Sequence, residues 1–197
     1  MHDTVQLRKC CQKDKDISQF FLNVFPADLL PSRLPDNCYL ILNTDPSNKG
    51  GQHWVAVCKK EGRGFYFDSY GRTPSRWFHA WQPLDRFRRS EADIQQDNSD
   101  VCGDYCLAFL KHMATGRSFE TFHKNFDEND DLSNDKAARA FAHKRWPRIL
   151  NPTPHVVEGA YDTDNQKQKP SQVGGLAETD FSFQTPHLMY VPEHSPS

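Results

Sequence analysis

The sequence lacks any hydrophobic run of the length needed to cross a membrane. It also lacks a leader-like apolar core, because Met1 to Lys15 is interspersed with Asp, Lys and Arg. These absences argue against a membrane protein and against a secreted one. We therefore expect a soluble, intracellular protein in reducing surroundings, with no membrane partner.

The six cysteines lack the dense, regular spacing of a disulfide scaffold. Nine histidines are present, but there is no Cys-x2-Cys pair, and Cys102-x3-Cys106 has no matching second half. We therefore expect no disulfide framework, no bound metal and no other cofactor.

The sequence has no excess of charge of one sign, since its net charge is −2. This balance argues against a general nucleic-acid-binding protein. Residues 151–197 hold two lysines and six acidic residues, a net charge of −4, which leaves +2 on residues 1–150. Basic residues cluster at Arg86, Arg88, Arg89 and at Lys144, Arg145, Arg148. Solvated helix faces explain such clusters, and DNA contact is the alternative.

The composition divides the chain into two parts. With 197 residues, of which 37% are hydrophobic, it has enough apolar side chains for one globular domain, predicted at residues 1–150. Residues 151–197 show no apolar periodicity and are predicted to be a largely disordered acidic tail. An apolar island at residues 181–190 is a candidate docking motif, and plain disorder is the alternative.

Apolar patterning and turn residues place the main elements of the domain. A continuous apolar run at 38–43 predicts a central strand, and residues 86–94 predict a further strand or an irregular crossing. A glycine turn is predicted at 62–64, and residues 17–25 are predicted to pack in the core. Helices are predicted at residues 5–13, 74–81, 102–113, 119–126 and 136–146. The helix at 102–113 has a glycine C-cap at Gly116. The helix at 136–146 has caps at 133–135 and ends at Pro147.

Cys102 stands at the start of the predicted helix 102–113. A polar, turn-rich stretch precedes it, and Tyr105, Cys106, Phe109 and Leu110 form an apolar face after it. At this position the helix dipole and the free N–H groups of the first turn favour a thiolate. Cys102 is therefore a candidate nucleophile, although most cysteines in a reduced chain are small buried hydrophobes.

A candidate base and its orienting acid lie upstream. His53 follows the Gly50-Gly51 turn and opens a β-branched, alternating segment, and Asp68 lies near the end of the next predicted strand. Two antiparallel neighbours joined by a short turn can bring these side chains together. An imidazole oriented by a carboxylate can take a proton from a thiol and return it to a leaving amine.

These residues carry a family resemblance. The chain has His53-Trp54 on one predicted strand, Phe67-Asp68-Ser69-Tyr70-Gly71 on the next, and Gln96-x5-Cys102-Gly103 entering a helix. This order resembles the cysteine proteases that unite the adenovirus maturation protease and the Ulp-type SUMO proteases, over roughly residues 17 to 126. The mixture of features is similar to proteases of adenovirus-like DNA viruses and of capsid-encoding transposons.

The resemblance implies a fold and a set of site residues. The fold would be α+β and papain-like, with a small mixed sheet, packed helices and the nucleophile at a helix N-terminus. His53, Asp68 and Cys102 would form the catalytic triad, and Gln96 would donate to the oxyanion. The adenoviral enzyme is activated by a peptide linked through a second cysteine between the acid and the nucleophile. No cysteine lies between Cys58 and Cys102, so the sequence gives no support to an activating peptide; peptide or DNA activation stays open.

The implied function is that of a cysteine endopeptidase that processes virus-like capsid precursors. The enzyme would act as a monomer on protein substrates. If it is viral, it would work in the host nucleus or in the virion. The alternative enzyme is a deconjugase that removes SUMO or ubiquitin. A third hypothesis is an inactive binding module that keeps the fold.

Overall fold

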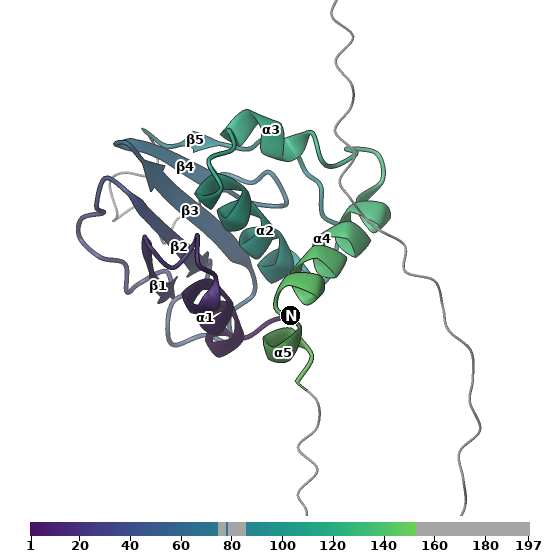
Figure 1. Cartoon of the computed structure of the whole chain (residues 1–197), viewed down its shortest axis with the longest axis horizontal. Coiled ribbons are helices and arrows are strands. Elements are labelled where there is room, and N and C mark those ends of the chain that lie inside the picture. The colour runs from purple at the N-terminus through teal and green to yellow at the C-terminus, as the bar shows by residue number, and fades with distance from the viewer. Residues whose placement is uncertain (75–77, 79–85, 153–197) are drawn as a thin grey trace, which may run out of the picture. The chain divides into compact units, whose positions relative to one another are not determined.

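The structure is a computed structural model that describes residues 1–74, 78 and 86–152 (Figure 1). The predicted helix at 74–81 lies mostly outside the described residues, as do the predicted disordered tail after residue 152 and its candidate docking motif at 181–190. No helix in the described part of the chain combines the length and the hydropathy that a bilayer span requires. The elements, in chain order, are α1 (Thr4–Lys13), β1 (Phe21–Phe25), β2 (Cys38–Asn43), β3 (Trp54–Lys60), β4 (Arg63–Phe67), β5 (Arg88–Arg89), α2 (Cys102–Ala114), α3 (Phe119–His123), α4 (Asp131–Arg145) and α5 (Pro147–Leu150).

The strands form one mixed sheet in the order β1-β2-β3-β4-β5. The inner strands β2, β3 and β4 pair antiparallel, whereas β1 runs parallel to β2 and β5 runs parallel to β4. All six residues of β2 are buried, which confirms the prediction of a central strand from its continuous apolar run. The apolar segment at 17–25 contributes the edge strand β1, and the predicted strand at 86–94 is reduced to the two residues of β5.

A two-residue turn joins β3 to β4. Lys60 pairs with Arg63, and the two residues between them have positive φ, 51° at Glu61 and 78° at Gly62. Such a turn matches the right-handed twist of its strands. The turn predicted at 62–64 was therefore placed one residue too late, because Arg63 and Gly64 already belong to β4.

The helix that begins at Cys102 was predicted to within one residue. α2 runs from Cys102 to Ala114, and Gly116 follows its end with a φ of 83°, as expected for a glycine after a helix C-terminus. Because the first turn of α2 lies against the sheet, both Cys102 and its neighbours are buried.

The start of α4 was predicted five residues too late. The N-cap is Asp130, whose side chain accepts a hydrogen bond from the backbone of Ser133. The polar residues at 133–135 are helical instead, and Asn134 exchanges two hydrogen bonds with the backbone of Asp127. Pro147 follows the end of α4 as expected, and it also begins the short helix α5, a position that its fixed φ favours.

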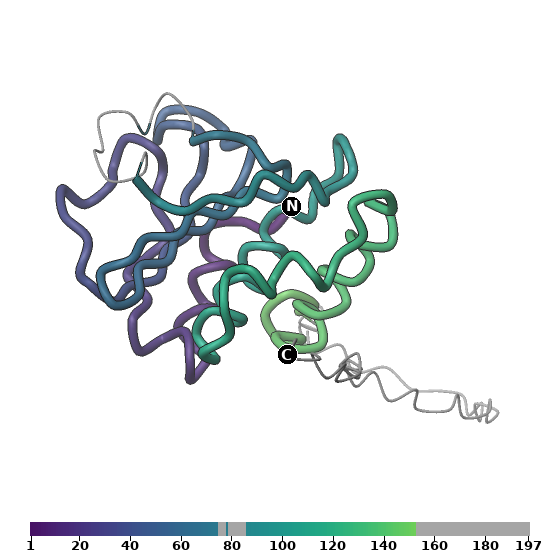
Figure 2. Tube along the Cα trace, turned by 90° about the horizontal axis from the view of Figure 1, so that it is seen from above, coloured from purple at the N-terminus to yellow at the C-terminus, as the bar shows by residue number. Residues whose placement is uncertain are grey.

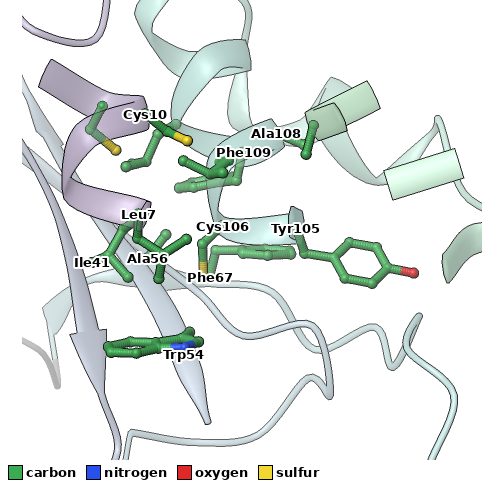
Figure 3. Packing of buried hydrophobic residues seen from close by; sticks show 14 of the residues in the cluster. Leu7, Cys10, Ile41, Trp54, Ala56, Phe67, Tyr105, Cys106, Ala108 and Phe109 are labelled. Carbon is green, nitrogen blue, oxygen red and sulfur yellow. The ribbon is translucent and has the colours of Figure 1, made fainter. Parts of the chain in front are cut away.

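The helices cover one face of the sheet, and the larger core lies between them (Figures 1 and 3). Leu7 from α1 and Phe109 from α2 pack there against side chains of β2 to β4, and the rings of Phe67 and Phe109 stack with centroids 4.9 Å apart. A smaller cluster, which includes Leu40 and Val57, fills the opposite face. Figure 2 shows the strands gathered on one side and α4 and α5 on the other. This packing fixes the N-terminus of α2 at one edge of the sheet.

Candidate active site

Three elements meet at this edge of the sheet. His53 immediately precedes β3, and Asp68 immediately follows β4. Since the two strands are antiparallel neighbours, the start of one lies beside the end of the other. α2 packs along β3 and begins with Cys102. The sheet register and the helix packing together therefore bring the three predicted residues to one place.

His53 and Asp68 form a buried pair. The ring Nε2 of His53 and Oδ1 of Asp68 are 2.7 Å apart, and the two residues are only 7% and 2% exposed. The same carboxylate oxygen accepts a second hydrogen bond from the backbone N–H of Tyr70 at 2.9 Å. The carboxylate of Asp68 is thereby held in one orientation and fixes the plane of the His53 ring. Nδ1 of His53 is then the ring nitrogen that is free to face another group.

The group that the ring faces is Cys102. Its side chain acts on the His53 ring through hydrogen bonding and through its charge, and both effects raise the pKa of His53. Burial by itself lowers the pKa of His53, but the hydrogen bonds to Asp68 and Cys102 and the negative charges of both outweigh it and raise the pKa to about 9. The ring is therefore cationic at neutral pH. A cationic imidazole against a cysteine in the first turn of a helix, where the dipole favours negative charge, is the arrangement of an activated thiol.

The other five cysteines differ from Cys102 in their surroundings. All six are buried free thiols. Burial raises the pKa of Cys10 and of Cys58 to about 12 and that of Cys38 to about 11. It also raises the pKa of Cys11 and of Cys106 well above the usual range. These five thiols are inert at neutral pH, so a reactive cysteine in this chain is expected to be Cys102.

Comparison with protein-family profiles matches residues 33–142 to the profile described as the Ulp1 protease family, C-terminal catalytic domain. The chain belongs to the Ulp1 protease family. The matched range is more than half of the chain and includes His53, Asp68 and Cys102. The predicted family and fold class are thus confirmed: the chain has the α+β fold of the Ulp1 family, whose members are cysteine peptidases.

The comparisons with solved structures and with curated sequences add less information about the family. The crystal structure of the Se-Met ASFV pS273R protease is similar to this Ulp1-family protease with 22% sequence identity and a TM-score of 0.37. The match covers 54% of this chain and 44% of that one, so the chain corresponds to less than half of that protein's length. A comparison with curated protein sequences gave no match.

Tyr70 is a site residue to which the sequence analysis assigned no role. Its ring lies against that of His53, with centroids 4.9 Å apart, and the guanidinium of Arg72 lies over the Tyr70 ring at 4.2 Å. Tyr70 lies in a turn after β4, in which the N–H of Gly71 donates to the carbonyl of Asp68 at 3.0 Å, so strand periodicity gave no signal for it.

Gln95, rather than Gln96, is the buried glutamine of the loop before α2. Its amide oxygen accepts from the Ser69 hydroxyl at 2.6 Å, and its amide nitrogen donates to the Tyr70 hydroxyl at 3.1 Å and to the Ser99 hydroxyl at 2.9 Å. Gln95 therefore ties the end of β4 to the loop that leads to Cys102. The adjacent pair of glutamines gave no signal of which one faces inward.

Gln96, the predicted oxyanion donor, has an exposed side chain. Its backbone carbonyl accepts from the Tyr70 hydroxyl at 3.5 Å. Among the described residues, those that line the groove beside His53 do not include it. The structure thus brings Cys102, His53 and Asp68 together and leaves the side chain of Gln96 at the surface near them.

A groove of about 530 Å³ opens beside His53 and Asp68. Its lining includes His53, Asp68, Tyr70 and Arg72, together with Asn98 from the loop before α2. Tyr70, Arg72 and Asn98 offer both apolar and hydrogen-bonding contacts, as a bound peptide requires.

Proposed function

We propose that this protease cleaves peptide bonds with Cys102 as the nucleophile, His53 as base and acid, and Asp68 as the residue that orients the His53 ring. The sulfur attacks the scissile carbonyl carbon, and the imidazolium gives its proton to the leaving amine as the C–N bond breaks. Water, deprotonated by His53, then attacks the acyl-enzyme and releases the carboxylate product and the free thiol. The observation that carries this proposal is the 2.7 Å contact between Asp68 and His53, together with the effect of Cys102 on the pKa of the His53 ring.

We assign the oxyanion site to the backbone N–H of Cys102 and the side-chain amide of Gln96. The exposed side chain of Gln96 has to turn toward the sulfur when substrate binds, because in the free structure it lies at the surface. Gln95 holds the backbone of this loop to Ser69 and Tyr70. One oxyanion donor typically contributes on the order of 10²–10³-fold in turnover.

The test of the chemistry is mapping of new peptide termini. The purified full chain is incubated under reducing conditions with candidate precursor proteins, and products are identified by mass spectrometry. New termini are expected with the unmodified chain and not with Cys102→Ala or His53→Ala. Cleavage that persists in Cys102→Ala would show that another group, or a contaminant, performs the reaction.

As substrate we propose virus-like capsid precursor proteins, cleaved internally. The run Asn43-Thr44, Gly50-Gly51 and His53-Trp54 supports this choice, since it is similar to the corresponding run of adenoviral proteases. Capsid genes encoded beside this chain would support the same substrate class independently.

The second candidate is removal of a ubiquitin-like modifier, which the match to the Ulp1 family profile favours. The two candidates predict different outcomes with the same enzyme sample. Release of a fluorophore from the C-terminus of a SUMO or ubiquitin reporter, with capsid precursors left intact, would select the deconjugase. Cleavage of precursors without reporter turnover would select the endopeptidase.

An inactive binding module would fail both assays. It would also leave Cys102 unlabelled by electrophilic peptide probes at neutral pH, whereas the raised pKa of His53 supports a labelled Cys102.

We further propose that the enzyme acts as a monomer and without DNA. In the two basic clusters, Arg88 pairs with Glu120, and Arg145 pairs with the buried Asp14 at 2.9 Å. Their charges are therefore partly neutralised within the chain, which supports solvated surfaces rather than a DNA-binding face. Sedimentation of the purified chain, with and without duplex DNA, tests both statements.

A further inference from the structure

His2, Asp104 and His143 meet on the helical side of the molecule. They come from the segment before α1, the first turn of α2 and the last turn of α4, and Figure 1 shows the N-terminus beside α4 and α5. Their nitrogen and oxygen donor atoms all lie within 4.8 Å of one another, and Nε2 of His2 is 2.5 Å from Oδ1 of Asp104. Two imidazoles and a carboxylate are a donor set that zinc takes readily.

Asp104 is the central residue of this cluster. It is only 1% exposed, and its second oxygen, Oδ2, is buried without a hydrogen-bond partner. The nearby Nε of Arg139 is 3.9 Å from this oxygen, beyond hydrogen-bonding distance. Leaving one oxygen of a buried carboxylate unsatisfied is unfavourable, so the site is incomplete as it stands.

His143 is held in the form that a metal ligand requires. Its Nδ1 is 2.7 Å from the side-chain oxygen of Asn151, an acceptor, so Nδ1 carries the proton of this bond. In the neutral ring, Nε2 then has a free lone pair. A hydrogen bond from the non-ligating nitrogen to an oxygen is the usual support of a metal-bound histidine.

We propose that His2, Asp104 and His143 bind a Zn²⁺ ion, with water as the fourth ligand. Zinc bonds of about 2.0–2.2 Å in a tetrahedron place neighbouring donor atoms about 3.3 Å apart. One present spacing is 2.5 Å and the others are no more than 4.8 Å, so side-chain movements of about 1.5 Å or less reach this value. Mg²⁺ and Ca²⁺ prefer oxygen ligands and fit this set poorly. The sequence predicted no metal because it has no Cys-x2-Cys pair, and these three donors are far apart in the chain.

The ion would connect the N-terminal segment to the nucleophile helix. Asp104 is two residues after Cys102, and the carbonyl of His2 accepts a hydrogen bond from the indole of Trp54, the residue after His53. At Gly103 an added Cβ would lie 3.3 Å from the His2 ring and 3.1 Å from Leu7, so glycine allows this close approach. Zinc at this site therefore stabilises the packing behind the triad, and it binds whether or not the peptidase chemistry is as proposed.

The experiment measures zinc directly in the full chain. Cys102→Ala is used as the parent, because a catalytic thiolate beside an imidazole can itself bind zinc. A C-terminal affinity tag without histidines is removed before the protein is loaded with Zn²⁺, dialysed and analysed for metal by mass spectrometry. One equivalent is expected to remain, and zinc is expected to raise the midpoint of thermal unfolding.

Matched histidine variants locate the site. His143→Gln and His2→Gln in the same parent are each expected to weaken zinc binding at least about tenfold in competition with a chromophoric chelator. His53→Gln serves as the control and is expected to bind zinc like the parent. Co²⁺ in the parent should give d–d absorption without a thiolate charge-transfer band.

Two results would overturn the site. One is a dialysed parent that retains no stoichiometric zinc although its circular dichroism shows it folded. The other is a His143→Gln variant that binds zinc as tightly as the parent, which would place the ion elsewhere in the chain.

Discussion

Asp68→Asn tests the electrostatics of the triad most directly, because the variant keeps the shape of the side chain and removes its charge. In the unmodified enzyme the pKa of His53 is raised from 6.5 to about 9, against an opposing effect of burial, with Asp68 as the first contributor. A shift of this size corresponds to about 3 kcal/mol in favour of the charged ring. Without the carboxylate, the ring is expected to return to its ordinary pKa or below it.

The size of the loss follows from the protonated fraction of His53. At pH 8 a ring with a pKa of about 9 is about nine-tenths protonated, whereas one with a pKa of 6.5 is about 3% protonated. Loss of the proton that the leaving amine needs therefore costs about thirtyfold at pH 8. Loss of ring orientation adds to this, within the total of about 10²–10⁴-fold that general acid–base catalysis contributes.

The assay is the pH profile of kcat/KM on whichever reporter the substrate tests identify. The unmodified enzyme is expected to lose activity on the alkaline side near pH 9, and Asp68→Asn near pH 6.5 or lower. Asp97→Asn is the matched control, since Asp97 is an exposed carboxylate that lines the same groove, and its alkaline limb should stay near that of the unmodified enzyme. If Asp68→Asn kept an alkaline limb near pH 9, the assignment of Asp68 as the partner of His53 would be refuted.

Stability gives a second readout that needs no substrate. Because the folded-state pKa of His53 is raised, its contribution to the free energy of unfolding is fully present below pH 6.5 and is lost as the pH rises through about 9. The stability difference between the unmodified enzyme and Asp68→Asn, measured by urea unfolding, should therefore shrink over this interval by about 3 kcal/mol. A difference that does not change with pH would contradict the raised pKa.

Three further predictions follow from the described residues. Iodoacetamide at pH 7 should label Cys102 in the folded enzyme and abolish activity, since burial raises the pKa of the other five thiols; peptide mapping that finds label on Cys106 as fast would contradict this. Gln96→Ala should lower kcat by about 10²–10³-fold and leave urea unfolding nearly unchanged. Gln95→Ala should instead destabilise the fold by about 1–3 kcal/mol, because its buried hydrogen bonds are lost. Gly62→Ala should cost about 1–2 kcal/mol because its φ is 78°, and Gly50→Ala, equally unhindered but without a positive φ, should be neutral in the same unfolding assay.

Most elements of the fold could be read from local patterns. The continuous apolar run of β2, the apolar face of α2 and the glycine after its end were predicted within a residue, because each depends on neighbouring side chains alone. Prediction failed where a distant contact changed the meaning of a local signal. The polar residues at 133–135 look like a helix cap, but Asn134 binds the loop at Asp127 and the helix begins before it.

The sequence by itself determined the chemistry of the site. His53, Asp68 and Cys102 each stand beside a turn or a helix start, which neighbouring residues alone indicate. The antiparallel register of β3 and β4 and the packing of α2 then bring the three residues together. Only the tertiary structure decided which glutamine is buried, how Tyr70 lies on His53, and that residues 2, 104 and 143 share a site. These arrangements join segments up to about 140 residues apart, and their geometry depends on the whole core rather than on any stretch of the chain.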